Sequence, residues 1–147
     1  MQVKPLWTEA DFESMSWHDS RLYSISFPNE KLKMTFDIDY LFKWEINKID
    51  NLYNFWVSPC DLIFSDVLNL EINFDFKNTV GLYIDNIARF NSRASFNEQK
   101  IIWHYKITTD KGIISFEGTE FIQIVKKQPI LTNSQVLDRK DVFSPTE

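Results

Sequence analysis

Residues 17–44 limit the fold of this chain most strongly, because apolar and polar residues alternate on both sides of a Pro-Asn-Glu-Lys turn signal. Four residues are an ordinary hairpin connection, and Pro and Asn favour a type I turn. Pairing the two halves around this turn sets Ile25 opposite Met34, with Tyr23 on the apolar face and Leu22 on the polar face. A half-buried hairpin requires such a division between its faces. The sequence therefore predicts an antiparallel hairpin against which later strands pair.

The alternation returns further along the chain. Residues 68–76 and 101–108 alternate strictly, and Asp110-Lys111-Gly112 is typical of a hairpin turn leading into residues 113–117. Aromatic residues make up 16% of the chain and favour strands and large buried cores. We expect a mainly β fold, an antiparallel β-sandwich or curved half-barrel of about eight strands with one or two short helices. The expected core contains Ile25, Met34, Phe36, Ile38, Leu70, Ile72, Phe74 and Trp103.

Other segments carry weaker patterns. Residues 52–57 and 60–64 are interpreted as two strands broken at Ser58-Pro59. Residues 80–84 are expected to return and pair with the strand before them. Residues 85–99 show weak helical spacing and otherwise indicate a loop.

The ends of the chain are interpreted from local signals. Thr8 followed by Asp11 is a helix-start pattern, which predicts a short helix over residues 9–15. After Pro129 the sequence is polar and unpatterned, which favours a loosely packed tail over residues 128–147. We expect a single domain over residues 1–147, since no change in composition marks a boundary.

Charge and cysteine content narrow the partners and the compartment. The net charge is −5, with 21 acidic and 16 basic residues, which disfavours nucleic acid and suits a basic protein partner. Cys60 is the only cysteine, so an internal disulfide is excluded. No apolar run approaches a membrane span, and the N-terminus lacks the apolar segment of a secretory signal. We therefore expect a cytoplasmic protein without a membrane partner.

One group of residues in the hairpin could form a binding site. In the predicted register the carboxylates of the second strand lie near the start of the first, and an imidazole shares their face. Such a group could bind a divalent cation or act as an acid–base pair. The alternative is a solvated sheet face on which an arginine pairs with an aspartate. The candidate binding residues are Trp17, His18, Asp19, Arg21, Asp37 and Asp39.

Other chemistry finds little support in the sequence. His18, His104 and Cys60 lack the spacing of a zinc site, and no base or positive charge neighbours Cys60 to activate its thiol. No phosphate loop, dinucleotide fingerprint or nucleophile elbow is present. Four tryptophans could line a ligand pocket, although packing is their commoner role: Trp17, Trp44, Trp56 and Trp103. We expect no cofactor, no metal and no catalytic residue.

Three segments carry a resemblance to a known group of proteins. WHDSRLYSISF, DIDYLFKW and FWVSPCDLIFSDVLNLEI resemble a family of small bacterial proteins of unknown function. That family shares a W-H-D opening, a D-[IF]-D-Y-[IL] strand ending in Trp, and an F-x-[VI]-[SA]-P segment. The resemblance covers residues 17–72 and implies no activity, cofactor or catalytic residue. Small acidic proteins of this kind include immunity proteins of toxin systems.

Two functions are compatible with these observations. The first is a non-enzymatic, immunity-protein-like binding module that uses an acidic sheet face including Asp37 and Asp39 to attract a basic protein partner. The second is a small-ligand-binding or metal-assisted hydrolytic site around His18, Asp19 and the same two aspartates. The absence of a recognisable catalytic motif favours the binding module.

Overall fold

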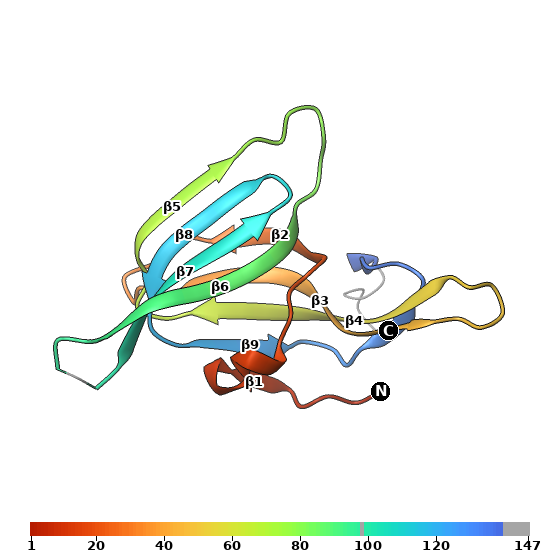
Figure 1. Ribbon diagram of the computed structural model, residues 1–147, viewed down its shortest axis with the longest axis horizontal. Helices are drawn as coiled ribbons and strands as arrows, with labels where there is room; N and C mark the ends of the chain where they lie inside the picture. The colour runs from red at the N-terminus through yellow and green to blue at the C-terminus, as the bar shows by residue number, and fades with distance from the viewer. Residues whose placement is uncertain (98, 140–147) are drawn as a thin grey trace, which may run out of the picture.

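The computed structural model describes residues 1–97 and 99–139, and ten strands in these residues form one antiparallel sheet (Figure 1). The strands are β1 (Leu6–Thr8), β2 (Ser20–Ser26), β3 (Met34–Ile46), β4 (Tyr53–Phe64), β5 (Leu68–Phe74), β6 (Tyr83–Ala94), β7 (Ile101–Thr109), β8 (Gly112–Gly118), β9 (Phe121–Val125) and β10 (Ile130–Thr132). Their order is β1-β9-β4-β3-β2-β6-β7-β8-β5, and β10 also pairs with β4. The mainly antiparallel β fold is thus confirmed, with more strands than expected.

The sheet folds back on itself without closing into a barrel. Its end strands, β1 and β5, do not pair with each other in the described residues. Figure 1 shows β5, β8, β7 and β6 as one group and β3, β4 and β9 as another. The ring of Phe64 in β4 lies 5.0 Å from that of Tyr105 in β7 and 4.8 Å from that of Phe116 in β8. The core is therefore the aromatic layer between the two groups.

The predicted core residues lie in this layer or against it. Met34, Phe36 and Ile38 are fully buried. The other expected core residues are partly buried and pack against the same cluster: Ile25, Leu70, Ile72, Phe74 and Trp103.

The predicted hairpin is present as β2 and β3, but its register is different. Ile25 pairs with Phe36 and not with Met34, so the connecting loop is longer than predicted. The register shifts again at Tyr23, where β2 has one more residue than β3. Such a β-bulge reverses which side chains face the core. Leu22 is accordingly buried, and the Tyr23 hydroxyl bonds on the opposite face, which corrects the predicted assignment of both.

The two strands predicted around Ser58-Pro59 are one continuous strand, β4. β3 pairs with the whole of one edge of β4, while β9 pairs with residues 60–64 and β10 with residues 55–57 of the other edge. Pro59 lies in the gap between these two partners, where its carbonyl oxygen accepts a hydrogen bond from the Lys126 amide. A proline is tolerated there because no pairing strand needs the missing amide hydrogen.

The prediction of helix or loop for residues 85–99 is wrong over most of its length, because β6 continues to Ala94. The register between β6 and β7 shifts twice, between Ile84 and Asn86 and between Phe90 and Arg93. These irregularities break the two-residue alternation by which a strand is recognised. β6 pairs with β2 and β7, so residues 83–84 do not pair with β5 as expected.

Both ends of the described chain pack onto the sheet. The predicted helix is a short 3-10 helix, η1 (Glu9–Ser14), and the Asp11 carboxylate accepts a hydrogen bond from the Thr8 amide at 2.9 Å. The predicted loose tail is ordered through residue 139, because β10 pairs with β4 and Leu137 is buried. Residues 140–147 of that predicted tail lie outside the described residues. No helix in the described residues has the length and hydropathy to cross a membrane.

Candidate functional site

The structure divides the six predicted binding residues among four places. Trp17 belongs to the core: only 3% of it is exposed, and its indole N–H donates to Gln123 Oε1 at 2.9 Å. Its ring lies 5.7 Å from that of Phe121. Trp17 is therefore a packing residue; of the other five, Asp39 is also buried, and the remaining four are partly or fully exposed.

Asp37 and Asp39 lie beneath the C-terminal segment. Arg139 Nη2 is 2.9 Å from Asp39 Oδ1, and Arg139 Nη1 is 2.9 Å from Asp37 Oδ1. Asp39 is fully buried, and its other oxygen accepts from the Leu137 amide at 2.9 Å and the Tyr23 hydroxyl at 2.6 Å. We call this arrangement, formed by Tyr23, Asp37, Asp39, Leu137 and Arg139, the C-terminal clasp. Neither aspartate is presented as an unpaired carboxylate.

The electrostatics of the clasp follow from its burial. Burial alone would lower the pKa of Arg139, but Asp39 and Asp37 outweigh it and raise this pKa. Burial, with the hydrogen bond to Asp39, also raises the pKa of Tyr23. Lys126 lies 3.1 Å from Asp37 and 3.1 Å from Asp61. Each of these three carboxylates thus contacts a cation, as in a structural network of ion pairs.

His18 and Asp19 lie together on the rim of the sheet. His18 Nδ1 is 3.1 Å from Asp85 Oδ1, and His18 Nε2 is 3.5 Å from Asp19 Oδ2. Asp19 has a φ of 65°, and its carboxylate accepts from Gln135 Nε2 at 3.1 Å. His18 is exposed, so this pair can reach a ligand or a partner.

A cavity of about 640 Å³ opens beside this pair. We call it the rim groove; its lining includes His18, Asp19, Phe42, Trp44, Tyr53 and Gln135. An adjoining cavity is lined by Asp19, Asp85 and Asp110. The pKa of Asp110 is lowered because hydrogen bonds from the Tyr83 amide and Lys111 outweigh the effect of burial. One wall of the groove is therefore aromatic and its neighbourhood is acidic.

The aromatic wall continues into a projecting hairpin. Figure 1 shows the distal end of β3 and β4 extending beyond the rest of the sheet. We call residues 44–53 the arm. Trp44 is 62% exposed and its ring lies 5.3 Å from that of Tyr53. The arm carries five exposed large apolar side chains: Trp44, Ile46, Ile49, Leu52 and Tyr53.

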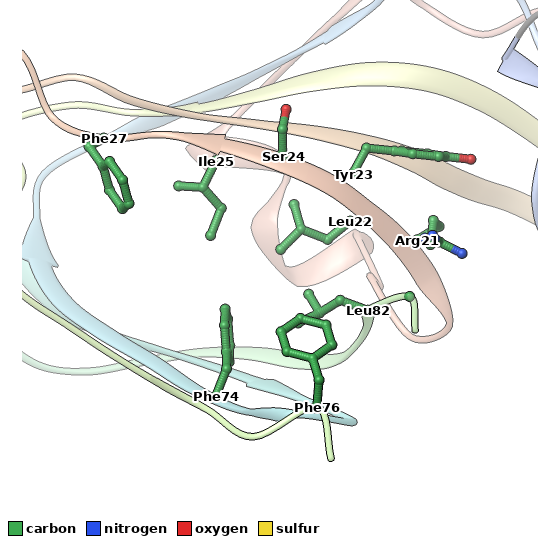
Figure 2. A pocket seen from close by; sticks show the side chains of 10 residues that line it. Arg21, Leu22, Tyr23, Ser24, Ile25, Phe27, Phe74, Phe76 and Leu82 are labelled. Carbon is green, nitrogen blue, oxygen red and sulfur yellow. The ribbon is translucent and has the colours of Figure 1, made fainter. Parts of the chain in front are cut away.

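Arg21 lies at a different opening, shown in Figure 2. Its guanidinium carbon is 5.2 Å from the ring centroid of Tyr23 and 5.3 Å from that of Tyr83. Leu22, Ile25 and Phe27 continue along the same strand and loop beside an apolar slot. Arg21 does not line the rim groove and forms no ion pair with the clasp aspartates in the described residues, although its guanidinium lies over the ring of the clasp residue Tyr23.

The remaining candidates for chemistry lie within the fold. Cys60 is fully buried, and burial raises the pKa of its thiol to about 12, so a thiolate is disfavoured at neutral pH. His104 Nε2 is 3.0 Å from the Ser115 hydroxyl. Within the described residues no three His, Cys, Asp or Glu side chains gather as metal ligands.

Reasoning from the sequence does not find the arm, because residues 45–51 (EINKIDN) are mostly polar and carry no strand pattern. Ile46, Ile49 and Leu52 lie three residues apart, so they do not show the two-residue alternation of a strand. Their unusual property is that they are exposed to solvent, which depends on how far the hairpin projects.

No family model matches the chain, and neither does any curated protein or solved structure. The geometry alone therefore bears on function.

Proposed function

We propose that this protein acts without catalysis, by binding another protein through the arm and the rim groove. The observation that carries the proposal is the set of five exposed large apolar side chains on the arm. Apolar surface gathered in this way is typical of interaction sites, and Trp and Tyr often contribute most of the binding energy. Trp44 and Tyr53 join this surface to the rim groove, because they also line it.

The charge beside the groove favours a partner with a basic surface. Asp19, Asp85 and Asp110 line the adjoining cavity, and the whole chain has a net charge of −5. Carboxylates at the edge of an apolar surface attract a basic partner and speed its approach. We assign this steering role to Asp19 and Asp85 in place of Asp37 and Asp39, which the clasp engages, and of Asp110, which pairs with Lys111 at 2.9 Å.

This mode of action suits an immunity-like protein, which blocks a toxin by binding it. We place the encounter in the cytoplasm, since the fold contains no disulfide and its only cysteine is buried. The alternative of a small-ligand or hydrolytic site around His18 and Asp19 needs Asp37 and Asp39 as well. We favour binding because Arg139 and Lys126 already contact those two carboxylates.

Two arm variants test the proposal. Trp44→Ser and Tyr53→Ser should each weaken the complex about tenfold or more, which corresponds to about 1.4 kcal/mol. Phe96→Ser removes an even more exposed aromatic ring outside the arm and is the control. A partner is first captured from cells that produce this protein, then purified, and its Kd is measured by calorimetry with each variant.

The contribution of the carboxylates to association is tested by a separate measurement. Asp85→Asn should slow association and reduce its dependence on salt, with little change in the dissociation rate. Unchanged affinity of the purified partner for both arm variants, with the fold intact by circular dichroism, would show that the arm is ordinary surface and that the proposal is wrong.

A further inference from the structure

β2 has one free edge beside an apolar slot, away from the arm. β3 pairs with one edge of β2 as far as Ser26. On the other edge, β6 pairs only with Ser20 and Arg21, and the Leu22 amide donates to the Leu82 carbonyl at 2.9 Å. In the described residues no strand pairs with this edge beyond Leu22. Backbone groups along residues 23–26 can therefore accept another strand.

The slot lies along this free edge. The slot is a cavity of about 370 Å³, and successive residues of β2 form one of its walls. Figure 2 shows Leu22, Ile25 and Phe27 on that side and Phe74 and Phe76 on the other. A chain beside β2 would thus hydrogen-bond to its backbone and insert alternate side chains into an apolar space, as in recognition by strand addition.

Arg21 gives one end of the slot a positive charge. No carboxylate of the described residues forms an ion pair with Arg21, and its buried Nε has no hydrogen-bond partner. Its guanidinium packs over Gly81, where a Cβ would lie 3.0 Å from Nη1. Gly81 also has a φ of 83°, which favours glycine. This arrangement leaves a cation at the slot without an anion.

The chain itself determines the direction of the added strand. β6 is antiparallel to β2, and its approach through Leu82 occupies the place beside Leu22. A peptide antiparallel to β2 in the remaining space would run toward Arg21 and end against Leu82. Its last residue would therefore place a carboxylate near Arg21. A parallel peptide would instead bring its N-terminal ammonium group toward the guanidinium, and two like charges repel each other.

We propose that this slot binds the C-terminal end of a partner protein as an additional strand on β2. The bound segment covers about four residues, because a strand advances about 3.3 Å per residue and the free edge spans residues 23–26. Its last and third-from-last side chains are apolar and enter the slot, and its terminal carboxylate pairs with Arg21. This site shares no lining residue with the arm or the rim groove and does not depend on the function proposed for them.

The test uses fluorescent hexapeptides with Val, Leu or Phe at the last and third-from-last positions and Thr between them. Each peptide is prepared as a free acid and as a C-terminal amide, and Kd is measured by fluorescence polarisation with the full chain. At least one free acid should bind about tenfold tighter than its amide, because only the acid pairs with Arg21. Hydrogen exchange should slow at the amides of residues 23–26 when that peptide is added.

Two pairs of variants assign the effect to the slot. Arg21→Gln should abolish the difference between acid and amide, and Arg21→Lys should keep part of it. Phe76→Ser should weaken binding of every peptide. Phe90→Ser, which removes an equally exposed ring from β6, should leave binding unchanged.

Three results would each overturn the proposal. One is the absence of binding by any peptide at 1 mM, about the weakest affinity worth assigning to a site. Another is equal affinity for acids and amides in the wild type. The third is a concentration-dependent dimer that Phe76→Ser disrupts, which would identify a second copy of the chain as the occupant of the edge.

Discussion

Gly112, at the β7–β8 turn, has no room for a side chain. Its φ is 146°, and a Cβ on this residue would lie 1.9 Å from the carbonyl oxygen of Asn73 in β5. Gly112→Ala should therefore lower the free energy of unfolding by about 2 kcal/mol or more, measured by urea denaturation. Gly118→Ala should cost less, because there the nearest atom, Ser65 O, is 3.1 Å away and φ is ordinary. A larger loss at Gly118 would contradict this account.

Single residues also show which local features could be predicted. The turn at residues 110–112 was predictable, because glycine at a sharp bend has a local physical cause. The bulge at Tyr23 was not, since no local signal marks an extra residue in a strand that otherwise alternates. One inserted residue was enough to exchange the faces of Leu22 and Tyr23.

At the scale of elements, the C-terminal clasp holds β10 and the segment after it against β3. Arg139→Gln would leave Asp39 as a buried carboxylate without its cation, which should cost about 3–5 kcal/mol of stability. Adding Asp39→Asn to this variant should recover part of the loss, because the buried charge is removed. Urea denaturation of the two single variants and the double variant gives the coupling between them.

Additive losses in that cycle would show that the two side chains do not stabilise each other. Asp37→Asn is the matched control. Its side chain is about one-third exposed and it also contacts Lys126, so its loss should be smaller than that of Asp39→Asn.

Strands were predicted correctly where a local sequence pattern determines them, and incorrectly where residues far along the chain determine them. The alternation of β5 and β7 showed these strands directly in the sequence. Pro59 suggested a break in β4, but the gap between β9 and β10 that accommodates it is formed by residues far along the chain. For the candidate site, the sequence showed that His18 and Asp19 stand at the start of the hairpin, and the structure has them together on the rim of the sheet. The burial of Asp39 was not predictable, because its cover includes Arg139, 100 residues away.

At the scale of the whole molecule, the buried aromatic layer makes stability sensitive to alkaline pH. Burial raises the pKa of Tyr40, Tyr105 and Cys60 to about 12 each, from ordinary values of 10.0, 10.0 and 9.0. Each group is therefore still neutral in the folded protein at a pH where it has ionised in the unfolded chain. The resulting stability is complete below about pH 9 and is lost as the pH rises toward 12.

Urea denaturation between about pH 8 and 11.5 checks this expectation, because in this range the three groups ionise in the unfolded chain while they stay largely neutral in the folded protein. The free energy of unfolding should fall with pH, and Tyr105→Phe should make the fall shallower by up to about 1.4 kcal/mol per pH unit. The same slope in the variant would mean that Tyr105 ionises equally in both states.

The position of Arg139 also has a consequence for the order in which the protein can be completed during synthesis. Translation produces β3 early, yet Asp39 meets Arg139 only after another 100 residues, and the indole of Trp17 waits 106 residues for Gln123. Until β9, β10 and Arg139 leave the ribosome, one edge of β4 has no pairing strand. The Asp39 carboxylate, which is buried in the folded protein, is then exposed to water. The β2–β3 hairpin and its neighbours β4 and β6 can form first, but the other edge of β4 is covered only when β9 and β10 arrive.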